Sequence, residues 1–226
     1  MKKKLLLFTL LLPTLLVAQT RFALKAGLNR AKVSIRQNTS SLTGETSERS
    51  GAFHITGVTE IPIHEPFFIQ PTLSLTQKGF SLIAIQSDNN NNRYDQLIKS
   101  TYTYIEVPVN FVAKFNLGKG KFTIGAGPYI AYGLSGKAKT SIVTTLENPS
   151  QGQQRTSITK SSEKVFSESG FKRLDAGISS LLGYQFKKGL FLEIGSDKGI
   201  TNIANEDNGG SIKNKVYSLS IGMFFK

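Results

Sequence analysis

The sequence contains no cysteine and only two histidines, and these absences narrow its chemistry. With no cysteine among 226 residues, disulfides, thiolate metal sites and a lipidated amino-terminal cysteine are all excluded. His54 and His64 are the only imidazoles that could act as a general base. We therefore assign no catalytic, cofactor-binding or metal-ligating residue and expect no cofactor.

Long hydrophobic runs are also scarce. The hydrophobic content is 39%, which is low for a membrane protein built from helices. The one long apolar run, residues 5–18, follows Met-Lys-Lys-Lys and is too short to cross roughly 30 Å of hydrocarbon as a helix. A charged start before a short apolar core is typical of a secretory signal peptide. We expect residues 1–18 to be removed, and residues 19–226 to form one barrel domain.

Acidic residues are few, with 15 Asp and Glu against 28 Lys and Arg, and the formal net charge is +13. Removing Lys2, Lys3 and Lys4 with the signal peptide lowers this charge from +13 to +10. The remaining basic residues are scattered and form no cluster interleaved with aromatics, so we expect no nucleic-acid partner. Anionic outer-membrane lipid, including lipopolysaccharide, is the expected counter-charge.

In place of helical spacing, the mature sequence shows apolar residues at every second position. Eight segments alternate in this way: 21–34, 51–63, 67–82, 101–116, 121–134, 171–186, 190–203 and 215–225. Each is at least as long as the roughly 9–11 residues of a tilted membrane strand, whereas ordinary strands have about half that length. The pattern predicts an all-β fold, an eight-stranded antiparallel up-and-down transmembrane β-barrel.

The connections between these segments alternate in length. Short turns with Pro or Gly occupy residues 64–66, 117–120 and 187–189. Long polar stretches occupy residues 35–50, 83–100, 135–170 and 204–214, of which 135–170 could extend the flanking strands or be disordered. Short turns on one rim and long loops on the other are typical of bacterial outer-membrane barrels. We therefore expect an integral protein of the cell outer membrane, with periplasmic chain ends and four external loops.

Alternation alone does not say which face is inside. A soluble lipocalin-like barrel buries its apolar face, and a membrane barrel reverses this. We favour the membrane arrangement because the polar faces carry small residues and charges of both signs that could pair in a narrow lumen. These charges are Lys25, Glu60, Lys78, Glu106, Lys114, Arg173, Asp175, Glu193 and Asp197. Aromatics that could form interfacial girdles are Phe67, Phe115, Phe122, Phe186 and Phe225 near the short turns, and Tyr132, Phe171 and Tyr217 near the long loops.

A few residues need separate explanation. Gly125, Gly127 and Gly133 are expected to leave lumen volume for side chains of neighbouring strands. Pro128 lacks an N–H and predicts a local bulge, and Pro71 and Pro108 raise the same question. Lys198 falls on the lipid-facing parity, so we expect it near the long-loop rim or next to a bulge. Tyr102 and Tyr104 are expected to pack inside the lumen.

Two short motifs suggest a family. Gly125-Ala126-Gly127-Pro128-Tyr129, Gly199-Ile200-Thr201-Asn202-Ile203 and the aromatic last segment give a sequence that resembles the PorT-like outer-membrane β-barrel family of Bacteroidota. The resemblance implies an eight-stranded barrel inserted by the barrel assembly machinery. The family's namesake is tied to type IX secretion, but most members have no assigned activity, so the resemblance implies a location and a fold and no specific function. A partner in a secretion system or at the cell surface is an expectation of the leading functional hypothesis.

Candidate functional residues were weighed against structural roles. His54, with Glu106 and Asp175 as partners, would be the base of an enzyme at the rim, but a buried hydrogen-bonding role is favoured; His64 is interpreted as a turn residue. The lumen charges are interpreted as an ion-pair plug rather than an ion path. Lys137, Lys139, Lys172 and Arg173 are candidates for contact with lipopolysaccharide phosphates. Asp88, Glu206, Asp207 and Asn208 resemble calcium ligands in type but lack the spacing of a calcium-binding loop, so they are interpreted as solvated loop residues.

Three functions remain open from the sequence. The leading hypothesis is a non-enzymatic structural or interaction protein, or an accessory of a surface or secretion complex. The second is a small-solute binding barrel or narrow pore. The third is a rim enzyme acting on lipid.

Overall fold

Every regular element that the structure describes is a β-strand. The computed structural model describes residues 20–37, 45–87, 93–148, 153–167, 170–205 and 210–225. The strands are β1 (Arg21–Gln37), β2 (Glu45–His64), β3 (Phe67–Ser87), β4 (Arg93–Leu117), β5 (Gly120–Asn148), β6 (Gln153–Lys164), β7 (Leu174–Gln185), β8 (Leu190–Gly199) and β9 (Gly210–Phe225). No helix in these ranges is long and apolar enough to cross a membrane. The residues expected to form a signal peptide lie outside the described part.

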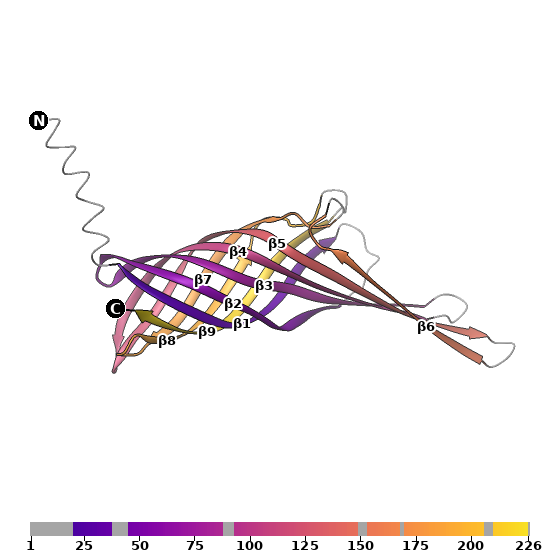
Figure 1. Ribbon diagram of the computed structural model, residues 1–226, viewed down its shortest axis with the longest axis horizontal. Coiled ribbons are helices and arrows are strands. Elements are labelled where there is room, and N and C mark those ends of the chain that lie inside the picture. Colours follow the sequence, from indigo (N-terminus) through magenta and orange to yellow (C-terminus); the bar gives the residue numbers. More distant parts are fainter. Residues whose placement is uncertain are drawn as a thin grey trace, which may run out of the picture.

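The strands close into a ring by antiparallel pairing of neighbours. β1 pairs with β2, β2 with β3, β3 with β4 and β4 with β5; β5 then pairs with β7, and the pairing continues through β8 and β9 back to β1. Figure 1 shows these strands running obliquely around one closed wall. The ring therefore has eight places, and the predicted antiparallel up-and-down architecture is confirmed. β6 is a ninth strand outside the ring, paired to the far half of β5.

One end of the barrel carries the short turns. β2 and β3 are joined at Glu65 and Pro66, and the other two turns contain Gly118 and Gly189, whose φ angles are 58° and 89°. Glycine adopts these positive angles without the steric cost that a Cβ brings. β1 begins and β9 ends at this same end, since Phe22 pairs with Phe225. The short turns predicted from Pro and Gly are confirmed.

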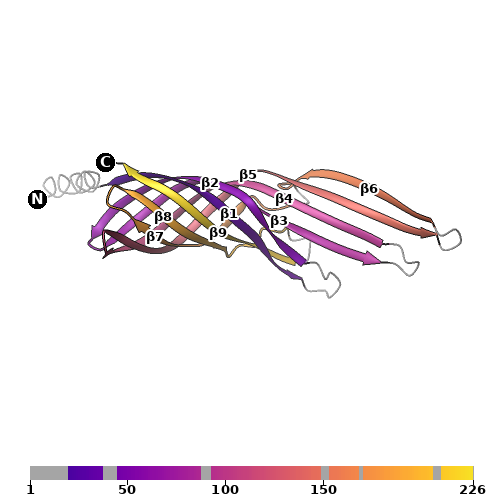
Figure 2. The ribbon, with the colours of Figure 1, turned by 90° about the horizontal axis from the view of Figure 1, so that it is seen from below.

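At the opposite end the strands run far into the stretches expected to be loops. β3 continues to Ser87, β4 begins at Arg93, and the expected loop 135–170 contains the end of β5 and all of β6. β-branched residues in this stretch, as in Thr140-Ser141-Ile142-Val143-Thr144, favour extended backbone. Figure 2 shows the resulting sheet of β3, β4, β5 and β6 projecting beyond the ring. The loop boundaries were therefore wrong. Extension of the preceding strand is correct as far as Asn148, whereas β6 is a separate strand that was not expected.

The apolar face of each ring strand points outward and the polar face inward. Leu28, Ile194 and Leu219 on the outward face are 65%, 61% and 60% exposed, whereas Glu60 and Asp175 inside are 0% exposed. A continuous apolar outer surface of this extent is unfavourable in water and favourable in a bilayer. The lipocalin-like alternative is excluded, because its apolar face would line the interior.

Small residues on the inner face make room for large ones, as predicted. A Cβ added at Gly133 would overlap the Phe166 ring, one added at Gly222 would overlap the Phe191 ring, and one added at Gly125 would press on the Val112 side chain. The interior is therefore filled by large side chains that lean onto glycines. An eight-stranded barrel leaves room for side chains and no water channel.

The bulge expected at Pro128 is absent. The pairs on either side of it, Pro108 with Tyr129 and Phe111 with Ala126, keep a single register between β4 and β5, and the ladder omits only the residues between them. Since proline has no N–H to donate, local hydrogen bonding is lost without an extra residue being inserted. The register shift between β4 and β5 lies instead at Thr103 and Tyr104.

Most of the expected girdle aromatics face outward. Phe67, Phe115, Phe186, Phe225, Tyr132 and Tyr217 are exposed, and Phe122 is half-buried. Phe171 was wrongly assigned: it precedes β7, and its ring packs against Phe80 and Tyr102 on the inside. Lys198 is exposed on the outward face at the long-loop end of β8, as expected.

A charge placed on the outward face tests the inside-out arrangement. Ile221 is 55% exposed and lies on β9, midway between the two aromatics Tyr217 and Phe225. Ile221→Arg is expected to lower the free energy of unfolding by about 2–4 kcal/mol in lipid vesicles, because a guanidinium would then lie near the bilayer midplane. Urea titration of the reconstituted protein measures this loss.

The matched control is Ile158→Arg on β6, where the side chain is 62% exposed but lies beyond the ring. Its effect is expected to stay within about 0.5 kcal/mol. Equal effects at the two positions would contradict a lipid-facing band.

Candidate functional site

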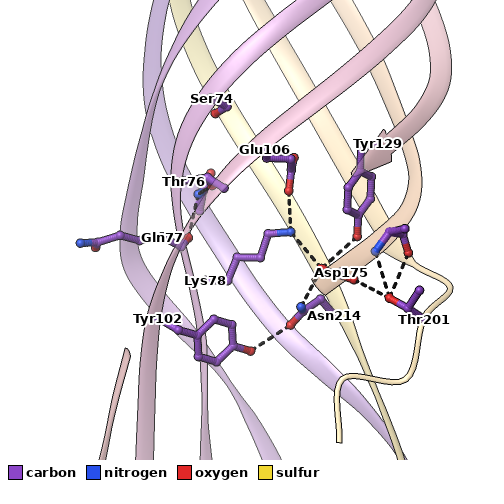
Figure 3. Close-up of polar contacts among 12 residues, drawn as sticks. Ser74, Thr76, Gln77, Lys78, Tyr102, Glu106, Tyr129, Asp175, Thr201 and Asn214 are labelled. Carbon is purple, nitrogen blue, oxygen red and sulfur yellow. Dashed lines mark hydrogen bonds and ion pairs between the residues drawn. The ribbon is translucent and has the colours of Figure 1, made fainter. Parts of the chain in front are cut away.

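The long-loop end of the lumen is organised around Asp175 on β7 (Figure 3). Its Oδ2 accepts hydrogen bonds from Lys78 at 3.3 Å, from Asn214 at 2.8 Å and from Tyr129 at 3.3 Å, while Oδ1 accepts one from Thr201 at 3.1 Å. These donors come from β3, β9, β5 and the segment that follows β8. One fully buried carboxylate therefore ties together parts of the ring that are far apart in sequence.

Lys78 is the cation of this cluster and is itself 1% exposed. Its Nζ lies 2.6 Å from Glu106 and 3.3 Å from Asp175, and it lies over the rings of Tyr104 and Tyr129, 5.1 Å and 4.8 Å from their centroids. A buried ammonium is tolerated only with such pairing, to which cation–π contacts add. The predicted ion-pair plug has its main element here.

The segment after β8 folds inward over this cluster. Residues 200–203 were expected to continue the strand, but the backbone N–H groups of Ile200 and Thr201 donate to the Ala176 carbonyl at 2.8 Å and 3.2 Å, so β8 ends at Gly199. Ile203 is consequently fully buried. The Gly199–Ile203 motif thus covers the lumen rather than lining it.

Aromatic rings cover the rest of the long-loop end of the lumen beside this segment. Tyr102 makes edge-to-face contacts with Tyr104, Phe166 and Phe171, and its hydroxyl donates to Asn214 at 2.9 Å. Both tyrosines are almost fully buried, which confirms their expected packing role. Such ring contacts add to the stabilisation from apolar burial. We call these four rings, with residues 199–205, the lumen cap.

His54 lies deeper in the lumen and its partners differ from those expected. Its Nδ1 is 2.8 Å from Asn29 Oδ1 and its Nε2 is 2.9 Å from Ser220 Oγ. Glu106 and Asp175 were expected as partners, but the ring extends from β2 to Asn29 on β1 and Ser220 on β9, which engage both of its nitrogens. The buried hydrogen-bonding role is therefore the correct interpretation. His64 is exposed at the end of β2, as expected for a turn residue.

A small polar cavity lies beside His54. It has a water-accessible volume of about 40 Å³ and is lined by His54, Glu106, Asn110 and Asp197, among others. This is room for a few water molecules. It is too small for the solutes that typical ligand pockets of about 300 Å³ or more enclose.

Two further ion pairs fill the rest of the lumen. Lys25 pairs with Glu193 in the middle, and Glu60 pairs with Lys114 toward the short turns. Around the second pair, Gln70 donates to Glu60 at 2.6 Å and Lys114 donates to Gln185 at 2.9 Å. The lumen is therefore blocked at three levels by paired and hydrogen-bonded charges.

Sequence reasoning found most of the lumen charges but misplaced one and missed the amides. Arg173 is exposed at the rim, where it donates to the carbonyls of Gly133 at 2.7 Å and Leu134 at 3.2 Å. The amides missed were Asn29, Gln70, Gln185 and Asn214. They share the parity of the lumen charges, and that signal could have found them. Thr201 gave no such signal, because it lies outside the strands.

The remaining candidates divide between a rim groove and unplaced loops. Lys137, Lys139 and Arg173 line one groove together with Lys99 and Lys164, which were not singled out; Lys172 is not part of its lining. The residues weighed as calcium ligands, Asp88, Glu206, Asp207 and Asn208, lie outside the described residues. Among the residues that the structure places, no cluster of His, Asp and Glu could hold a metal ion.

The contribution of the Asp175 cluster to stability can be measured by removing the Asp175 carboxylate. Asp175→Ala leaves Lys78 paired with Glu106 alone, and it removes the carboxylate that accepts hydrogen bonds from Asn214 and Thr201. We expect a loss of about 3–5 kcal/mol in the free energy of unfolding, the usual cost of breaking one partner out of a buried pair. Urea titration of the reconstituted protein gives the value.

Asp95→Ala is the matched control, because Asp95 pairs with Arg93 where both side chains are solvent-exposed. Its loss is expected to stay within about 1 kcal/mol. A similar cost for the two substitutions would refute the central place of Asp175.

Comparison with known proteins places this architecture in a family. The structure is similar to those of Ail, the attachment invasion locus protein of Yersinia pestis (12% identity, TM-score 0.42), and of OprG from Pseudomonas aeruginosa (8%, TM-score 0.46). Each comparison covers 91% of this chain, with 98% of Ail and 95% of OprG. The outer membrane protease OmpT of Escherichia coli is also similar (11%, TM-score 0.39), over 91% of this chain and 96% of OmpT. No functionally curated protein matches the sequence. The family described as outer membrane protein beta-barrel domain matches residues 17–205, and the chain therefore belongs to this family of integral outer-membrane proteins.

Proposed function

We propose that this outer-membrane barrel is a surface interaction protein, whose closed ring anchors a sheet for contact with another protein. The long-loop end faces the cell exterior in this proposal, and the chain ends face the periplasm. The partner is a surface protein or a component of a secretion complex, in line with the PorT-like resemblance of the sequence. Insertion by the barrel assembly machinery belongs to the same proposal.

The observation that carries the proposal is the projecting sheet. β4, β5 and β6 pair beyond the ring over many residues, for example from Lys137–Lys164 to Asn148–Gln153 between β5 and β6. In the part of the chain that the structure describes, β6 pairs only with β5 and ends the sheet. An open strand edge can accept an extended segment of another chain through backbone hydrogen bonds.

The composition of β6 selects the kind of partner. This edge strand carries Arg155, Lys160 and Lys164 against the single acid Glu163, and lysine on an edge discourages pairing between identical chains. The same charges favour an acidic extended segment over a neutral one. The interaction is therefore expected with a different protein and not with a second copy.

The closed lumen supports an anchor in preference to a pore or an enzyme. The ion pairs of Lys25, Lys78 and Lys114 and the lumen cap lie across the lumen at successive levels. His54, the base that a rim enzyme would need, has both ring nitrogens bound inside the lumen. We assign no reaction to the chain.

Shortening the β5–β6 hairpin tests the role of the sheet. Lys139 and Ser162 are register partners, so joining them through Asn-Gly removes residues 140–161 and still closes a hairpin. The ring stays intact, because β7 pairs with β5 only between Lys121 and Tyr132. After chemical cross-linking of whole cells, the full chain is expected to co-purify with a surface protein that the shortened chain loses.

Heat-modifiable migration in detergent gels serves as the control for insertion of the shortened chain. Identical cross-linked partners for the two chains would rule out the sheet as the contact surface.

Conductance in planar bilayers tests the closed lumen. We expect purified protein to give no stable channel steps above the lipid baseline, because three levels of paired charge block the ring. Regular single-channel steps would overturn the anchor proposal in favour of a narrow pore. The Asp175→Ala variant is measured in the same way. Removing this carboxylate loosens the charge cluster, and we expect at most rare, brief channel openings from it.

A further inference from the structure

A groove with five cations lies on the outward face where the barrel meets the projecting sheet. It has a volume of about 650 Å³, and its cations are Lys99 on β4, Lys137 and Lys139 on β5, Lys164 on β6, and Arg173 before β7. No acidic residue is among those that line it. The groove therefore concentrates positive charge without an internal counter-ion in its lining.

The strand register places these lysines directly opposite one another. Lys99 pairs with Lys139 across β4 and β5, and Lys137 pairs with Lys164 across β5 and β6. Like charges opposite each other on one face destabilise a sheet. Since the four side chains follow the same alternation, the two pairs form neighbouring rows, roughly 7 Å apart along β5. An anion between them would turn this repulsion into attraction.

The apolar outer band of the barrel ends next to the groove, on the side toward the short turns. On the same face of β5, Ile130, Tyr132 and Leu134 are about half exposed, and Leu134 also lines the groove. Lys137 follows Leu134 after three residues, roughly 10 Å along the strand. A ligand that bridges these two surfaces must have an apolar body and an anionic head at the level of the membrane interface.

Arg173 lies at the edge of the groove that is nearer to the ring of the barrel. Its guanidinium donates to the Gly133 and Leu134 carbonyls and lies 5.2 Å from the centroid of the Phe166 ring, so it is held in place by the lumen cap. A planar, preorganised guanidinium is well suited to phosphate. The groove thus combines one fixed cation with four lysines on more extended side chains.

From these observations we propose that the groove binds the phosphorylated head of an outer-leaflet glycolipid of the lipopolysaccharide type, with its acyl chains against Ile130, Tyr132 and Leu134. A lipid with one phosphate would neutralise only part of five cations, so a head with at least two phosphates fits better. The site goes beyond the proposed partner-binding role of the sheet, but it rests on the same orientation of the long-loop end.

Binding of bisphosphorylated lipid A to the protein in phosphatidylcholine nanodiscs tests the site. Nanodiscs expose both barrel ends, so the result does not depend on orientation in cells. Lys137→Gln with Lys139→Gln is expected to weaken lipid A binding about 10- to 30-fold, since each cation near a membrane surface contributes on the order of a factor of five. Lys187→Gln with Lys188→Gln, at a short turn, removes equal charge at the other end and is expected to leave binding unchanged.

Thermal unfolding of the same samples separates a lipid site from a general charge effect. Without lipid A, the Lys137/Lys139 variant is expected to unfold at the same or a higher temperature than the wild type, because cross-strand repulsion is relieved. Adding lipid A is expected to raise the unfolding temperature of the wild type more than that of the variant, since a ligand that binds only the folded state stabilises it.

Three outcomes would overturn the proposal. Equal loss of binding in the Lys187/Lys188 control would indicate that total charge alone is sensed. Equal affinity for phosphatidylglycerol or for dephosphorylated lipid A would show that a head with several phosphates is not required. Unchanged lipid A binding in the Lys137/Lys139 variant would rule out the lipid and favour an acidic protein as the ligand of the groove. The shortened hairpin keeps all five cations but lacks most of β6, so it would show whether such a protein binds the groove or the β6 edge.

Discussion

The pairing of buried charges inside a narrow ring is the constraint on which the rest of this structure depends. In a bilayer the apolar faces of the strands must point outward, so the polar faces are forced into a narrow lumen that side chains fill, apart from room for a few water molecules. Each charge there needs an opposite charge and hydrogen bonds. Lys78 finds them in Glu106 and Asp175, and Lys114 finds them in Glu60 and Gln185. The lumen is therefore a polar core of paired side chains.

Because the core is solid, the places where the protein can meet other molecules are its outward face and its ends. The short-turn end consists of tight connections, whereas the long-loop end carries the sheet built from β3 to β6. The same strands that hold the luminal pairs continue into this sheet: β4 carries Glu106 within the ring and Lys99 in the rim groove. A rigid lumen therefore fixes the position of the external surface.

The short segment Gly199–Ile203 serves the fold by closing one end of the lumen. Thr201 donates to Asp175, Asn202 accepts from the backbone N–H groups of Ala204 and Ile212, and Ile203 is fully buried. These contacts turn the chain inward and close the lumen beside the aromatic rings. The motif acts by covering the barrel, and the two surfaces proposed to bind other molecules, the sheet and the groove, lie elsewhere.

The sequence by itself determined that eight alternating segments form the ring and where the short turns lie, because a period of two residues and the turn preferences of Pro and Gly are local properties. The period showed that each strand has two faces, and the opposite charges and glycines on one of them favoured that face as the inner one. It also identified Asp175, Lys78 and Glu106 as lumen residues. Only the tertiary structure decided which charge meets which: Lys25 pairs with Glu193 across 168 positions of sequence, a contact set by ring closure and register. The inward turn after Gly199, the engagement of His54 with Asn29 and Ser220, and the meeting of Lys99 with Lys139 depend on neighbouring strands in the same way. Alternation along one strand carries no information about how far it is shifted against the next, and that shift decides every one of these contacts.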